Sequence, residues 1–62
     1  MYTSEDLQAI ENHASKLIPT ATSELSAYLR AIEEYVRKKR KSLSFEQAEH
    51  LETQLLVHYG LE

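Results

Sequence analysis

The sequence predicts an all-α fold, built as a small antiparallel three-helix unit. Apolar residues recur at helical spacing in three separate segments, which is the periodicity of amphipathic helices. The 62 residues include only one glycine and one proline, and residues with capping side chains precede each segment. With 42% hydrophobic and 27% charged residues, the composition is that of a folded domain rather than a disordered chain. We therefore expect a single helical domain over residues 1–62.

The first helix is predicted over residues 4–18. Thr3 or Ser4 can cap its N-terminus, and Glu5 and Asp6 follow in the first turn, where negative charge interacts favourably with the helix dipole. Pro19 ends this helix, because the residue before a proline is pushed out of the helical region. The apolar side chains fall within an arc of about 100°, as expected for one buried stripe. They are Leu7, Ile10, Ala14, Leu17 and Ile18.

The second helix is predicted over residues 22–41. Thr20, Thr22 and Ser23 are alternative N-caps, so only a few residues connect this helix to the first, and such a short link favours antiparallel neighbours. Its apolar face spans about 160°, which is wider than one contacting helix requires. We therefore expect this helix to contact two neighbours. The face consists of Leu25, Tyr28, Leu29, Ala31, Ile32, Tyr35 and Val36.

The third helix is predicted over residues 45–59. Ser44 and Gln47 have the spacing of a capping box, which is the clearest helix start in the chain. Gly60 suits the position just after a helix, where a left-handed backbone conformation is common. The predicted apolar face consists of Phe45, Ala48, Leu51, Leu55, Leu56 and Tyr59.

The small size of the chain predicts a homodimeric helical bundle. A domain of this length buries only roughly 60% of the surface that its unfolded chain exposes, so its stability is marginal. The absence of cysteine excludes both disulfides and thiolate metal sites as stabilising features. Oligomerisation is the remaining general means of stabilisation, and the wide face of the second helix is the candidate surface. The predicted self-association face is Leu25, Tyr28, Leu29, Ile32, Tyr35 and Val36.

A run of five basic residues, 37–41, is the candidate site for a charged partner. It carries +5, while the segments before and after it each carry −4. Clustered cations can neutralise phosphates, but a solvated helix end is the favoured interpretation of this run, because Glu33 and Glu34 beside it would repel a phosphate backbone. Arg30, Arg37 and Lys41 would lie within about 40° on one helix. The candidate contacts with a partner or phosphate are Arg30, Arg37, Lys38, Arg40 and Lys41.

The sequence contains no motif typical of catalysis or of cofactor binding. It has no nucleophile elbow and no glycine-rich phosphate loop, and a core this small leaves little room for a concave pocket. No two of His13, His50 and His58 are separated by four residues, so we expect no metal site and no cofactor. No apolar run approaches the ~20 residues of a membrane span. The N-terminus lacks the features of a signal peptide, so we expect a soluble cytoplasmic protein.

These observations predict a small regulatory or adaptor protein that is not an enzyme and that acts by protein–protein interaction through its amphipathic helices. The alternative is weak, largely sequence-independent binding of nucleic acid through the basic cluster 37–41. A helix-turn-helix reader is disfavoured, because the third helix carries Glu46, Glu49 and Glu52, which a phosphate backbone would repel. The sequence does not identify the protein partner.

Overall fold

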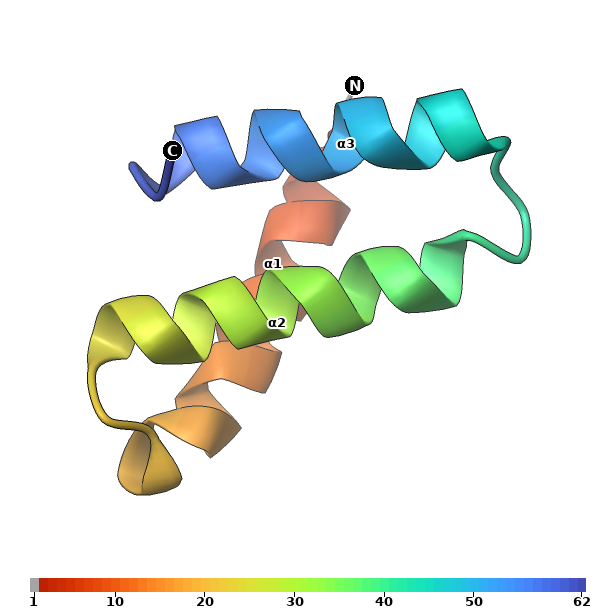
Figure 1. Cartoon of the computed structure of the whole chain (residues 1–62). Helices are drawn as coiled ribbons and strands as arrows, with labels where there is room; N and C mark the ends of the chain where they lie inside the picture. Colours follow the sequence, from red (N-terminus) through yellow and green to blue (C-terminus); the bar gives the residue numbers. More distant parts are fainter. Residues whose placement is uncertain (1) are drawn as a thin grey trace.

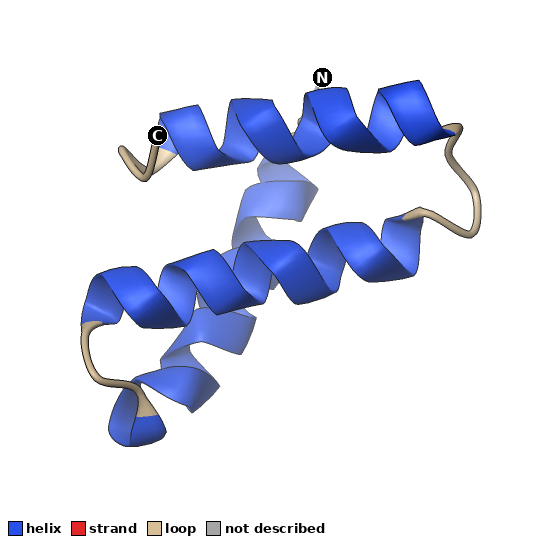
Figure 2. Cartoon of the chain, viewed as in Figure 1, coloured by secondary structure: helices blue, strands red, loops and turns tan. Residues whose placement is uncertain are grey.

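The computed structural model describes residues 2–62, and all regular structure in this range is helical (Figures 1 and 2). Helix α1 spans Ser4–Leu17, and a short 3-10 helix, η1, spans Ile18–Thr20. Helix α2 spans Glu24–Lys39 and helix α3 spans Phe45–His58. The prediction of an all-α three-helix unit is therefore confirmed.

Helices α2 and α3 lie side by side as an antiparallel hairpin, and α1 crosses behind them (Figure 1). Helix α2 packs against both α1 and α3, which is the double contact that its wide apolar face predicts. Because α1 covers only one side of the hairpin, the opposite side of α2 and α3 has no third helix over it.

Side-chain caps fix the start of each α-helix. The Thr3 hydroxyl accepts a hydrogen bond from the Asp6 N–H, and the Asp6 carboxylate accepts one from the Thr3 N–H. Ser44 and Gln47 form the same reciprocal box at the start of α3, as predicted. Ser23, one of the three predicted alternatives, caps α2. These bonds satisfy backbone donors that the first turn of a helix leaves unpaired.

Gly60 ends α3 in the predicted way. Its φ is +71°, a left-handed conformation that favours glycine, and the N–H groups of Gly60 and Leu61 donate to the carbonyls of Val57 and Leu56. This pair of bonds is a Schellman motif.

Several predicted boundaries are wrong by one or two residues. Helix α1 ends at Leu17 rather than at residue 18, since Ile18 and Pro19 belong to η1, and α3 ends at residue 58 rather than 59. Helix α2 runs from residue 24 to residue 39 rather than from 22 to 41. The Lys39 carbonyl accepts from the N–H groups of residues 42 and 43, which turns the chain towards α3. The last two basic residues therefore lie outside the helix.

The hydrophobic core lies where the three helices meet, and it is small. Among residues 2–62, nine hydrophobic residues are buried, and four of them are alanines, whose small side chains let helices approach closely. Tyrosines and leucines that remain half-buried surround this cluster. The buried residues are Ile10, Ala14, Ala27, Ala31, Ile32, Val36, Ala48, Leu51 and Leu55. None of the helices formed by residues 2–62 has the length and apolar character that crossing a membrane demands.

Candidate functional site

The structure buries some residues of the predicted self-association face and leaves others exposed. Ile32 and Val36 are 0% and 1% exposed, so they belong to the core of the single chain and are not open to a second copy. Tyr28 and Tyr35 are half-buried. The prediction is wrong for Ile32 and Val36, because a helical wheel cannot show how much of a wide face the chain covers with its own helices.

Leu25 and Leu29 are the exposed part of that face, at 62% and 40%. Tyr28 packs against Tyr59 at the end of α3, with ring centroids 5.0 Å apart. Leu25 lies almost one turn closer to the N-terminus of α2, beyond the point where α3 ends. No helix of the chain reaches far enough to cover it.

Phe45 is the most exposed large hydrophobic residue, at 72%, although its place in the apolar pattern of the third helix predicts burial. It is the first residue of α3 and lies beside Arg40, where α2 has just ended; the Arg40 guanidinium carbon is 5.6 Å from the ring centroid. The sequence does contain a signal for this exposure: Phe45 directly follows the N-cap Ser44, where a side chain points past the neighbouring helix.

Exposed and half-buried side chains share one side of the α2–α3 hairpin. Leu29 of α2 and Arg40, the residue that caps the C-terminus of α2, are eleven residues apart and lie within about 20° of each other around the helix axis. On α3, Phe45, Glu49, Glu52 and Leu56 stand at i, i+4, i+7 and i+11, which is one helical stripe. We call this surface the outer face. It consists of Leu25, Leu29, Arg40, Phe45, Glu49, Glu52 and Leu56.

Helix α1 lies on the other side of the hairpin. Glu34 and Tyr35, which contact His13 and Asp6 of α1, lie about 120° and 140° from Arg40 around α2. Figure 1 shows the same arrangement, with α1 behind the hairpin. Helix α1 therefore does not cover the outer face.

The basic cluster is partly neutralised by the fold. The Arg40 guanidinium lies 2.8 Å from a Glu49 carboxylate oxygen and 3.7 Å from a Glu52 oxygen, so it joins α2 to α3. The Arg30 Nε lies 3.2 Å from Glu34. Lys39 extends over the Tyr35 ring, with its ammonium 5.5 Å from the ring centroid. The candidate contacts Arg30 and Arg40 thus already have partners inside the chain.

Arg37, Lys38 and Lys41 are exposed, and no carboxylate of residues 2–62 lies within ion-pair distance of them. Arg37 and Lys38 project from the last turn of α2. Lys41 lies in the turn that follows, so the predicted alignment of Arg30, Arg37 and Lys41 along one helix does not form. Three cations around a helix end remain available to solvent or to an anionic partner.

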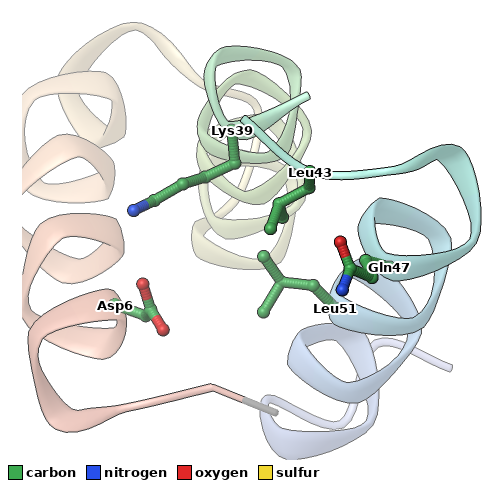
Figure 3. A pocket seen from close by; sticks show the side chains of 5 residues that line it. All are labelled: Asp6, Lys39, Leu43, Gln47 and Leu51. Carbon is green, nitrogen blue, oxygen red and sulfur yellow. The ribbon is translucent and has the colours of Figure 1, made fainter. Parts of the chain in front are cut away.

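A shallow cavity of about 200 Å³ opens between the three helices, lined by Asp6, Lys39, Leu43, Gln47 and Leu51 (Figure 3). Asp6 and Lys39 point into it from α1 and α2, with leucines from the turn and from α3 beside them. The Asp6 carboxylate accepts hydrogen bonds from the Tyr35 hydroxyl and from Thr3. Burial raises the pKa of Asp6, but these hydrogen bonds and the Lys39 charge outweigh it, and the pKa lies below its usual 3.8. The carboxylate in this cavity is therefore already hydrogen-bonded, and the five lining residues include no nucleophile paired with a base.

His13 and Glu34 form the main polar clamp between α1 and α2. The His13 Nε2 and a Glu34 carboxylate oxygen are 2.5 Å apart, and Arg30 contacts the other oxygen of the same carboxylate. The hydrogen bond with His13 is the largest cause of a pKa of Glu34 below its usual 4.5; desolvation opposes it, and the contact with Arg30 adds to the lowering. Both side chains of the clamp are partly exposed, at 38% for His13 and 34% for Glu34.

We expect the stability of the protein to fall in acid because of Asp6 and Glu34. Both carboxyls have lowered pKa values in the folded state, so their contribution is complete above the unfolded values of 3.8 and 4.5 and is lost as pH falls through the folded values. The variant Asp6→Asn/Glu34→Gln should unfold at lower urea concentration than wild type at pH 7, and the difference should shrink at pH 3. The exposed Glu62→Gln is the control, and an equal difference at both pH values would contradict the expectation.

The remaining histidines do not form a site. The Tyr2 hydroxyl lies 3.0 Å from the His58 Nδ1, and His50 is exposed. Residues 2–62 contain no cluster of three or more histidine, aspartate or glutamate side chains placed to bind a metal. Comparisons with protein-family models, with curated proteins and with solved structures each found no match.

Proposed function

We propose that this chain is a non-catalytic regulatory or adaptor protein that acts by protein–protein interaction and that assembles as a homodimer. The observation that carries the proposal is the outer face, on which Leu25, Leu29 and Phe45 are 62%, 40% and 72% exposed. A single exposed apolar residue is ordinary, but several on one open face indicate an interaction surface.

The composition of the core supports assembly. Four of the nine buried hydrophobic residues are alanines, which contribute little burial energy, and the chain contains no cysteine that could form a disulfide. A second molecule that covered the outer face would bury large apolar side chains that a chain of this length leaves exposed. A second copy of the chain is available as a partner wherever the protein is present.

Sedimentation equilibrium across a concentration series tests the homodimer. We expect a reversible monomer–dimer equilibrium with a folded, helical species throughout. A chain that stays folded and monomeric up to high micromolar concentration would contradict the homodimer.

Binding of a different protein is tested by affinity capture with matched variants. A partner that wild type and Val57→Glu retain, and that Leu29→Glu loses, supports an interaction through the outer face. Val57 is a suitable control because it is 59% exposed and lies about 120° from Phe45 around α3. Capture that is equal for all three proteins would contradict a role for this face.

One observation favours the alternative, nucleic-acid binding: Arg37, Lys38 and Lys41 are exposed and have no carboxylate within ion-pair distance among residues 2–62. Neutralising three phosphates gives a dependence of log affinity on log salt no steeper than about −3. Binding to generic duplex and single-stranded DNA should then be weak, salt-sensitive and lost in Arg37→Gln/Lys38→Gln/Lys41→Gln. Equal anisotropy changes for wild type and this variant at low salt would exclude the alternative.

A further inference from the structure

We propose that the cavity between the three helices binds a small zwitterion of the α-amino acid class that carries an apolar side chain. The Lys39 ammonium pairs with the carboxylate of the ligand, and the Asp6 carboxylate accepts a hydrogen bond from its amino group. Leu43 and Leu51 contact its side chain. The cavity is separate from the outer face, so this site does not depend on the proposed homodimer.

Two opposite charges face each other in this cavity without forming a direct ion pair. Figure 3 shows the Lys39 ammonium, from the last residue of α2, and the Asp6 carboxylate of α1 pointing towards one another. The ion pairs of residues 2–62 within 4.0 Å do not include these two groups, so a larger gap separates them. The Lys39 charge still contributes to the lowered pKa of Asp6, whose carboxylate is therefore ionised at neutral pH. A ligand that pairs with both groups must carry one charge of each sign.

Both charged groups retain capacity for a ligand. One oxygen of Asp6 accepts from the Tyr35 hydroxyl, and the other accepts from the N–H of Thr3 at 2.8 Å and from its hydroxyl at 3.1 Å. An ionised carboxylate has about four acceptor positions, so one remains for the amino group of a ligand. The Lys39 ammonium lies 5.5 Å from the centroid of the Tyr35 ring, and this contact uses none of its three N–H donors in a conventional hydrogen bond.

The apolar part of the cavity has room for an aliphatic side chain. Leu43, from the turn after α2, and Leu51, from α3, lie beside the two charged groups (Figure 3). The cavity measures about 200 Å³. A protein cavity of roughly 150 Å³ already holds a molecule of benzene, so a branched aliphatic chain of four carbons fits beside the charged groups. Because the cavity opens to solvent, such a ligand can enter without movement of the helices.

The pair of opposite charges favours a zwitterion over a ligand of a single sign. A phosphate or a simple carboxylic acid can pair with Lys39, but its negative charge then lies near the Asp6 carboxylate. A simple amine meets the converse repulsion from the Lys39 ammonium. A molecule that carries both charges interacts favourably with both groups.

Titration with free leucine, followed by amide chemical shifts in NMR spectra, tests the site. We expect saturable shifts for the backbone amides of Leu43, Gln47 and Leu51, which line the cavity. Isocaproate lacks only the amino group of leucine, and isoamylamine lacks only its carboxylate. Each should bind at least about tenfold more weakly, because each loses one hydrogen-bonded charge pair. These analogues test the role of Asp6 without a substitution that would also remove the cap of α1.

Two neighbouring lysines provide matched variants. Lys39→Gln should weaken the binding of leucine at least about tenfold, whereas Lys38→Gln should change it by less than about twofold. Lys38 is exposed and lines a different cavity, between α1 and α2, so its variant removes the same charge outside the proposed site. Glutamine is a good helix former, and far-UV circular dichroism should show both variants folded.

The contrary results are specific to this site. Shifts that grow in proportion to the leucine concentration without saturation would overturn the proposal, since they indicate only non-specific contact. Equal binding of leucine and its two analogues, or equal weakening by Lys39→Gln and Lys38→Gln, would overturn it as well. Sedimentation and affinity capture test the proposed function without leucine, so neither result decides the other.

Discussion

Replacing Ile32 by alanine is expected to lower the free energy of unfolding by about 2–5 kcal/mol, the range for large-to-small substitutions in protein cores. Ile32 is completely buried in the cluster that joins the three helices. Its truncation removes apolar burial and leaves a void that the neighbouring side chains only partly fill. At about 0.05–0.15 kcal/mol per residue, a chain of this length has roughly 3–9 kcal/mol of stability in total. Against that total, the expected loss runs from about a fifth of the stability to all of it.

Urea unfolding followed by far-UV circular dichroism measures this loss. Wild type and variants must be compared at one protein concentration, because the proposed dimerisation would make apparent stability depend on concentration. Val57→Ala is the matched control; Val57 is 59% exposed, so its truncation should change the unfolding free energy by less than about 0.5 kcal/mol. An Ile32→Ala variant as stable as this control would show that the described core does not hold the fold together.

Enlarging Ala31 to leucine is expected to cost about 1–3 kcal/mol, because overpacking forces neighbouring side chains and backbone to shift. Ala31 is 0% exposed and lies on the side of α2 that faces α1. Its small side chain lets α1 and α2 approach closely where they cross. Leucine at this position must push the helices apart or adopt a strained rotamer, and either change also disturbs the clamp between His13 and Glu34.

Ala9→Leu is the control for this prediction, because it makes the same chemical change beside a cavity. Ala9 is half-exposed and lines a cavity of about 240 Å³ between α1 and α2. The added carbons can enter this space, so we expect a change of less than about 1 kcal/mol in either direction. Equal losses for the two variants in urea unfolding would attribute the effect to helix propensity rather than to packing.

The helices could be predicted because their signals are local. Thr3, Ser23 and Ser44 cap the backbone groups next to them, and Gly60 ends α3 through its own φ, so neighbouring residues suffice to locate these boundaries within a residue or two. The predicted end of α2 at residue 41 lies two residues beyond the observed end, because basic residues are good helix formers. The chain leaves the helix at Lys39 in order to turn back towards α3, and that requirement is not local.

The candidate site was predicted only in part, because exposure depends on what the rest of the chain covers. Val36 and Leu25 belong to the same apolar face of α2, yet α3 covers the first and ends before it reaches the second. Phe45 follows the apolar pattern of α3 but lies beyond the last turn of α2. In the basic cluster, five consecutive cations look alike in the sequence, whereas the fold pairs Arg40 with Glu49 and leaves Lys38 exposed.

Periodicity and capping thus determined that this chain forms three helices and that α2 contacts two neighbours. These features follow from interactions within a few residues and from the amount of apolar surface in the chain. The tertiary structure decided which apolar and charged side chains remain available to another molecule. The lengths of the helices and the way they cross decide which side chains stay exposed, because a side chain beyond the end of the neighbouring helix is not covered.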